Sequence, residues 1–250
     1  MRTRNNAAIG ATVQSLLGRP MQELALEAYT LMHLADTAFP TGGFAFSQGL
    51  ESMGKSGHLK SEKDLDEYLL SQLKTVCEFE LPFINSSYAL YDDFDNNTLL
   101  SMTNEWEAFN TVESIRKASE ILGENWFSLI KSAYKPNDIE ELEQQFRSRS
   151  LPKYFQIVLP LLLRRIGFER TAIQRLVLYM ALRDQFSAGI RLGLIGPLRA
   201  QALHVAIAPK CEALRLRFAD TTYDRAVRSQ PMIEMAQTGH QYMYSKLFQN

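Results

Sequence analysis

The apolar residues of this chain recur at helical spacing, and this constrains the fold more than any other feature. From Ser61 onward, Leu65, Leu69, Leu70 and Leu73 fall on one face of a helix. Leucine greatly outnumbers valine, and no segment shows sustained alternation of polar and apolar residues with hairpin turn signals. The pattern predicts an all-α fold, a single helical domain of roughly ten helices.

Helix starts and breakers set the expected boundaries. Ser61 and Asp64 resemble a capping box, and Pro82 is expected to end or kink the helix that follows. Asp138 is placed to cap a short charged helix, and Pro160 is expected to interrupt the apolar run 157–163 as a helix. A glycine-punctuated segment, 187–198, is expected to connect two helices. The expected helices are 21–36, 61–81, 98–110, 112–134, 138–147, 154–166, 171–186, one from 198, and one from near 231 towards the C-terminus.

The first 22 residues differ in composition from the rest. They contain Arg2, Arg4 and Arg19 and no acidic residue. An organelle transit peptide can have this composition, but a flexible arm before the first helix is favoured because chain termini commonly fray. We therefore expect residues 1–22 to form a flexible N-terminal arm and residues 23–250 to form the helical domain.

Composition narrows the function classes. Apolar residues make up 46% of the chain, enough for a globular core, and the formal net charge is -1. Without a basic excess there is no broad electrostatic footprint for nucleic acid. The longest apolar run, 157–163, is far too short to span a bilayer. Cys77 and Cys211 could form one disulfide, but two reduced thiols are favoured. We expect a cytoplasmic protein that binds neither nucleic acid nor membrane.

One stretch matches the phosphate-loop pattern of nucleotide hydrolases. Gly49, Gly54, Lys55 and Ser56 stand at the spacing G-x-x-x-x-G-K-[ST]. A phosphate loop needs a buried strand before its first glycine and a helix directly after its Ser or Thr. Here a glycine-rich segment precedes the match and Gly57 follows it. The match is interpreted as accidental, with a P-loop NTPase kept as an alternative function.

The segment around Ser47, AFSQG, resembles the nucleophile elbow of serine hydrolases, with Ala45 in place of the first glycine. No strand precedes it, so the favoured interpretation is a serine that hydrogen-bonds to the backbone near a helix start. A serine hydrolase remains a second alternative. No two histidines lie at i, i+3 or i, i+4, and neither cysteine neighbours a histidine. We predict no catalytic, cofactor-binding or metal-binding residue, and no cofactor.

A longer stretch, LADTAFPTGGFAFSQGLESMGKSGHL, resembles the N-terminal signature of the UreF family of urease accessory proteins. In that signature the positions after Gly-Leu-Glu vary, so the Gly-Lys-Ser of the phosphate-loop match falls on variable positions. The residues that fit the signature in order are Asp36, Phe39, Pro40, Gly42 or Gly43, Phe44, Ser47, Gly49, Leu50 and Glu51.

Three further segments agree with the same family. IRKASEILG matches at Arg116, Ser119 and Gly123. LRDQFSAGIRLGLIGPLRAQ matches at Arg183, Asp184, Ser187, Ala188, Arg191, Leu192, Gly196, Pro197 and Gln201. GHQYMYSKLFQN resembles the family's C-terminal ending at His240, Tyr244, Ser245, Lys246, Leu247 and Phe248, with Lys246 where arginine is usual.

The resemblance implies an all-helical, homodimeric scaffold without catalytic activity. Members of the family bind a second accessory protein, UreD (also called UreH). Together they recruit the GTPase UreG, which delivers nickel to apo-urease. The resemblance also implies that nickel passes through the complex with UreD rather than binding a site in this chain. By the positions that match, the expected partner-binding residues are Phe39, Pro40, Phe44, Ser47, Glu51, Arg183, Arg191, His240, Tyr244, Lys246 and Phe248.

The end of the chain is rich in aromatic residues, with Tyr242, Tyr244 and Phe248. Simple packing of the last helix on its own core would also account for them. Since aromatic and cationic side chains anchor interfaces, we predict that residues 244–250 serve binding more than stability. Deleting them is then expected to leave the melting temperature nearly unchanged and to weaken assembly with UreD or UreG.

Overall fold

The computed structural model describes residues 21–249, and it divides into two compact units, Met1–Phe39 and Pro40–Asn250. In the first unit, the helix α2 (Met21–Ala35) ends one residue before the predicted limit. It is followed by a turn in which the Phe39 N–H donates to the Asp36 carbonyl at 3.2 Å. The predicted arm, residues 1–22, falls almost wholly outside the described residues and stays a prediction.

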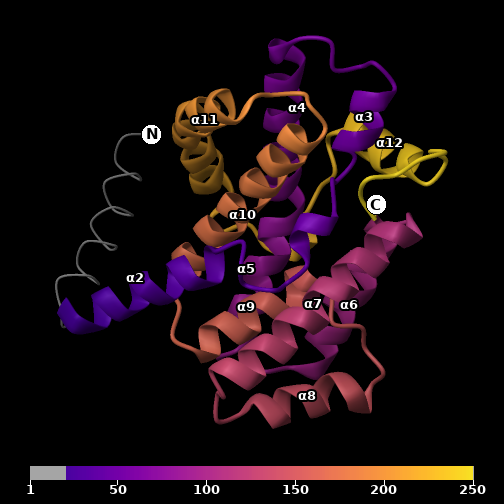
Figure 1. Cartoon of the computed structure of the whole chain (residues 1–250). Helices are drawn as coiled ribbons and strands as arrows, with labels where there is room; N and C mark the ends of the chain where they lie inside the picture. Colours follow the sequence, from indigo (N-terminus) through magenta and orange to yellow (C-terminus); the bar gives the residue numbers. More distant parts are fainter. Residues whose placement is uncertain (1–20, 250) are drawn as a thin grey trace. The chain divides into compact units, whose positions relative to one another are not determined.

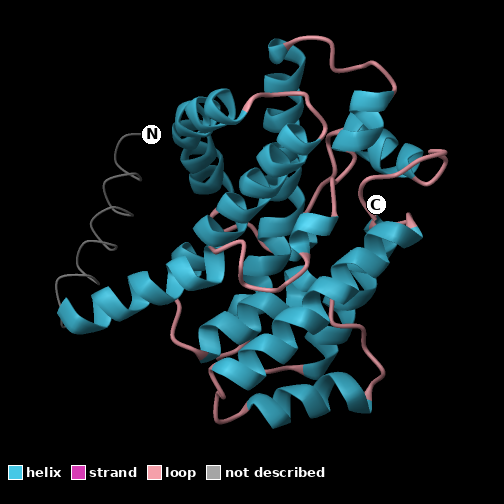
Figure 2. Cartoon of the chain, in the orientation of Figure 1, coloured by secondary structure: helices cyan, strands magenta, loops and turns pink. Residues whose placement is uncertain are grey.

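The second unit is built from helices and connecting loops, and no strand occurs among residues 21–249 (Figure 2). The predicted all-α fold is therefore confirmed. The elements of the second unit are η1 (Gly43–Ala45), α3 (Leu50–Lys55), α4 (Glu62–Thr75), the π-helical turn η2 (Val76–Glu80), α5 (Leu81–Leu90), α6 (Asn96–Phe109), α7 (Glu113–Ala133), α8 (Ile139–Ser148), α9 (Phe155–Arg165), α10 (Arg170–Arg191), α11 (Pro197–Phe218), η3 (Tyr223–Arg225) and α12 (Pro231–His240).

Helix α9 is the centre of this unit. It packs against α5 and α7 and also contacts α10 (Figure 1). Every residue from 157 to 163 is buried, as expected for a helix that is apolar all round. The prediction that Pro160 interrupts this run was wrong, because α9 continues through it. Packing on all sides offsets the helix hydrogen bond that Pro160 lacks.

Pro82 does not end its helix. Residues 62–90 form one helical run, α4–η2–α5, and the Leu81 N–H donates to the Val76 carbonyl, five residues back. Proline cannot donate to the carbonyl four residues earlier, that of Glu78. That carbonyl instead accepts from the Val227 N–H at 3.0 Å. The π-helical turn therefore accommodates the proline without an unpaired carbonyl.

Two other local predictions were wrong. Helix α10 continues to Arg191, beyond the predicted end at 186. Gly189 packs closely against Ile195, since a Cβ there would lie 3.3 Å from the Ile195 Cγ2. Asp138 lies at the N-cap of α8, but its side chain makes no capping hydrogen bond and pairs with Arg165 at 2.9 Å. The capping box is confirmed, since Ser61 and Asp64 bond each other's backbone N–H groups at the start of α4.

The last helix begins at Pro231, as predicted, but α12 ends at His240. Residues 241–249, here called the tail, follow it without regular helix. Helices α3 and α12 pack together, at the end of the unit opposite α8 (Figure 1). Among residues 21–249, none of the helices is both long enough and apolar enough to span a membrane.

Candidate functional site

The candidate site begins at a tight loop before α3. Gln48 and Gly49 have φ angles of 53° and 94°, so both adopt the left-handed conformation. Glycine is required at 49 for a second reason: a Cβ there would lie 2.9 Å from the Cβ of Ala236 in α12. The loop therefore brings α3 into close contact with α12.

Buried polar side chains hold this loop in its conformation. The Gln48 carbonyl accepts hydrogen bonds from the Gln72 side chain at 2.7 Å and the Tyr68 hydroxyl at 3.0 Å. The Ser47 carbonyl accepts from the Gln185 side chain at 3.0 Å. These bonds tie the loop to α4 and α10, which satisfies backbone groups that a left-handed turn leaves unpaired.

Ser47 has the structural role that the sequence favoured. Its hydroxyl is buried and accepts the Glu51 N–H at 3.5 Å, in the first turn of α3. Its carbonyl accepts the Leu50 N–H. Residues 21–46 contain no strand, so the strand-to-helix elbow of a serine hydrolase is not formed at Ser47.

The phosphate-loop match folds as a helix. Residues 50–55 are α3 itself, so Lys55 lies in its last turn rather than before a helix N-terminus. The Lys55 amine donates to Glu51 at 2.6 Å and to the Ser245 carbonyl at 2.9 Å. A phosphate at this helix end would meet the negative end of the helix dipole. The geometry does not fit a phosphate loop.

Glu51 is the centre of the site. Its carboxylate is fully buried, and each oxygen accepts two hydrogen bonds. Oε1 accepts from Lys55 at 2.6 Å and from the Leu247 N–H at 2.7 Å. Oε2 accepts from His240 Nε2 at 2.9 Å and from the Phe248 N–H at 3.1 Å. Burial by itself raises the pKa of the Glu51 carboxyl, but these hydrogen bonds lower it to about 2.

The tail is fastened at further points beside Glu51. The Arg191 guanidinium donates to the Phe44 carbonyl at 2.9 Å and lies over the Phe248 ring, 4.3 Å from its centroid. The Gln249 N–H donates to the Ala45 carbonyl at 2.9 Å. We call residues 44–55 together with Arg191 and His240 the tail cradle. Because Phe248 is buried in this cradle, the structure favours a larger contribution of the chain end to stability than the sequence suggested.

The cradle and the tail segment that it holds contain six of the predicted partner-binding residues: Phe44, Ser47, Glu51, Arg191, His240 and Phe248. The cradle contacts described above do not involve the other five. Tyr244 is fully exposed, and Lys246 donates to the Gln241 carbonyl at 3.2 Å rather than to a carboxylate. Arg183 pairs with Asp184 at 2.8 Å. Pro40 begins the second unit, and Phe39, in the first, contacts the His33 ring edge-on. Whether any of these residues binds a partner stays a prediction.

The segment IRKASEILG, which lies in α7, has a structural explanation. A Cβ on Gly123 would lie 1.7 Å from the Lys153 carbonyl oxygen, so only glycine lets the chain pass there. Ser119 accepts the Phe155 N–H at 3.0 Å and donates to Gln156 at 2.7 Å. The motif therefore fixes the start of the central helix α9.

Sequence reasoning missed the glutamines that hold the loop and the true role of Lys55. Gln72, Gln185 and Gln237 come from three different helices, and no local spacing relates them to Gln48. Gln185 stands inside a recognised motif, which was the available signal.

Among residues 21–249 no group of three or more His, Cys, Asp or Glu side chains could hold a metal ion.

These observations define a class: an all-helical protein that holds its own tail in a buried polar site. The model of the UreF family matches residues 59–208. Urease accessory protein F from Oryza sativa subsp. indica is 30% identical over 220 residues, which cover 86% of this chain and 82% of that protein. The protein of the same name from Arabidopsis thaliana is 27% identical, covering 86% and 89%. Urease accessory protein UreF from Nitrosospira multiformis is 23% identical, covering 88% and 96%. The chain belongs to the UreF family of urease accessory proteins.

Proposed function

We propose that this protein is a non-catalytic scaffold of urease maturation in the cytoplasm. It binds UreD (UreH), with UreD recruits the GTPase UreG, and so supports GTP-dependent insertion of nickel into apo-urease. Membership of the UreF family supports this role. The observation that carries it is the docked tail, because a segment held by its backbone and by Phe248 leaves its other side chains available to a partner.

The side chains that the tail and α12 expose have the chemistry of an interface. Tyr242 is 80% exposed, and the neighbouring exposed apolar residues come from the same short segment of the chain. Aromatic residues and methionine are enriched at protein interfaces. The exposed residues of this segment are Met232, Met235, Tyr242, Tyr244 and Leu247.

The direct test is co-purification of the protein with UreD and UreG, followed by urease activation in cells that lack the native protein. We expect a complex of the three proteins and restored urease activity. A protein that folds but neither assembles with UreD nor restores activity would contradict the proposal.

A double variant tests the exposed side of the tail. We expect Tyr244→Ala with Leu247→Ala to keep the melting temperature of the wild type, since both side chains point to solvent. Loss of an interface hot spot costs about 2 kcal/mol or more, roughly thirtyfold in affinity, so co-purification with UreD or UreG should weaken accordingly. Leu100→Ala, at an exposed leucine of α6, is the control. Unchanged assembly of the double variant would show that the tail is not part of the interface.

Helix α11 supports the homodimer that is part of this proposal. Its inner face buries Ala200, Leu203 and Ile207. Its outer face carries a second apolar row at alternating spacings of four and three residues, and exposed apolar patches commonly mark contact sites. We assign this row to contact with a second copy of the chain. It consists of Leu198, Ala202, Val205 and Pro209, all exposed, and continues at Leu216.

A charge in the middle of this row should separate the two copies. We expect Val205→Glu to convert a dimeric wild type into a folded monomer, because the carboxylate would be buried without a partner. Light scattering coupled to size exclusion gives the mass. Val227→Glu, at an exposed valine outside α11, should stay dimeric. A dimeric Val205→Glu variant would show that α11 is not the contact.

A further inference from the structure

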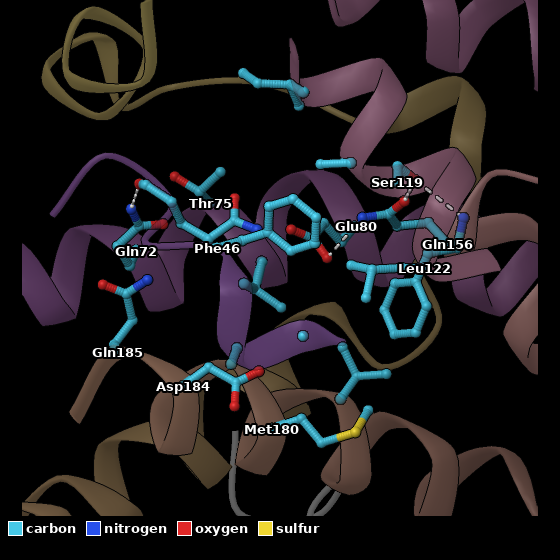
Figure 3. A pocket seen from close by; sticks show the side chains of 18 of the residues that line it. Phe46, Gln72, Thr75, Glu80, Ser119, Leu122, Gln156, Met180, Asp184 and Gln185 are labelled. Carbon is cyan, nitrogen blue, oxygen red and sulfur yellow. Dashed lines mark hydrogen bonds between the residues drawn. The ribbon is translucent and has the colours of Figure 1, made fainter. Parts of the chain in front are cut away.

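A cavity of about 120 Å³ lies inside the second unit, beside the loop that leads to α3. Figure 3 shows its lining: Phe46 from the loop, Gln72 and Thr75 from α4, Ser119 from α7, and Asp184 and Gln185 from α10. The π-helical turn adds Glu80, which accepts a hydrogen bond from Gln156 at 3.1 Å (Figure 3). Polar side chains from α4, η2, α7, α9 and α10 therefore meet around one cavity.

Several side chains that line the cavity have a buried polar atom without a hydrogen-bond partner. Within the described part of the chain, Trp106 Nε1, Gln185 Oε1, Gln237 Oε1 and Arg228 Nε are buried and have no hydrogen-bond partner, and all four residues line the cavity. Arg228 Nε has only a long ion pair with Glu234, at 3.7 Å. Trp106, Gln185 and Gln237 are each less than a tenth exposed. Buried polar atoms in native proteins almost always find a partner, from the protein or from ordered water. The cavity must supply these partners.

The two glutamines are paired at one end only. The Gln185 amide group donates to the Ser47 carbonyl at 3.0 Å, and that of Gln237 donates to Gln48 Oε1 at 3.3 Å. Their oxygen atoms need donors. The Trp106 and Arg228 N–H groups need acceptors. A ligand that satisfies all four must be small, uncharged, and both donor and acceptor.

A bound cation does not meet this requirement, because two of the unpaired atoms are donors. Two acidic side chains, Glu80 and Asp184, also line the cavity. Burial raises the pKa of Glu80, against the hydrogen bond from Gln156 and the charge of Arg228. Burial likewise raises the pKa of Asp184, against its pairing with Arg183. At roughly 15 Å³ for each molecule, the cavity has room for several waters.

We propose that the cavity holds a cluster of ordered water that bridges Trp106, Arg228, Gln185 and Gln237. Gln185 and Gln237 also hold the loop at 47–48, so the water fixes the orientation of their amide groups and thereby positions the loop. The bridge links α6 and α10 to α12 and to the segment after η3. This inference is independent of the proposed function, since it concerns only the fold that carries the tail cradle.

The test uses crystals of the full chain, with and without xenon pressure, and water-to-protein NMR transfer in solution. We expect ordered water within hydrogen-bond distance of Trp106 Nε1 and Gln185 Oε1, and no xenon, because xenon fills dry apolar cavities. The Trp106 indole N–H should show a cross-peak with water. The signal is assigned by its loss in Trp106→Phe, which keeps a ring against Tyr154.

The crystal data and the NMR data can each contradict the proposal. Xenon in the wild-type cavity, or an empty cavity with no water cross-peak at Trp106, would overturn the proposal. A metal ion or an organic molecule at the four unpaired atoms would overturn it as well. If Trp106→Phe does not fold, the wild-type crystal and xenon data still decide the question.

Discussion

Glu51→Ala is expected to destabilise the protein by about 3–5 kcal/mol, because removing one partner of a buried ionic cluster leaves the others uncompensated. His240 and the Leu247 and Phe248 N–H groups would lose their acceptor, and Lys55 its counter-charge. Urea unfolding followed by circular dichroism measures the loss. Hydrogen exchange should show residues 247–249 released in the native state. A variant with wild-type stability and a protected tail would contradict the role of Glu51.

The same carboxylate makes tail docking dependent on pH. Its pKa falls from the ordinary 4.5 to about 2 on folding. A lowered folded-state pKa means that the contribution to stability is complete above about pH 4.5 and is lost as the pH falls through about 2. Glu51→Gln cannot ionise, so its stability should depend less on pH between 5 and 2 than that of the wild type. Equal pH dependence of the two proteins would exclude Glu51 as the titrating group.

Phe248→Ala is expected to cost about 3 kcal/mol, since it removes a buried ring from beneath Arg191. For a chain of this size this lowers the melting temperature by about 6–12 °C. Deletion of residues 244–250 should lower it at least as far, which reverses the expectation from sequence. Tyr244→Ala, at a fully exposed side chain, is the control and should melt as the wild type. A Phe248→Ala variant that also melts as the wild type would show that the tail is not docked in solution.

Most of the fold could be predicted, because helical spacing and caps are local signals. The capping box at Ser61 and the start of the last helix at Pro231 were read directly from the sequence. The errors came from residues whose effect depends on distant partners. Pro160 stays inside a helix because α5 and α7 pack around it. Gly189 lies inside α10, where it packs closely against the distant Ile195.

The candidate site was predicted in part. The motif residues around Glu51 and His240 do meet in space, although 189 residues separate them in sequence. What could not be predicted is how they meet. A buried carboxylate that accepts backbone N–H groups of the tail leaves no trace in local spacing, and Lys55 matched a pattern whose geometry it does not adopt.

The sequence separation across the tail cradle has a consequence during protein synthesis. Glu51 and Leu247 are 196 residues apart, so the carboxylate is made long before its partners leave the ribosome. Domains begin to fold as they emerge, and during that time the Glu51 carboxylate in α3 lacks the α12 and tail donors that it has in the folded protein. The exposed tail surface therefore forms only after residues 241–249 have been made. If a partner recognises the docked tail, as the proposed function requires, it would bind only chains that already contain this segment.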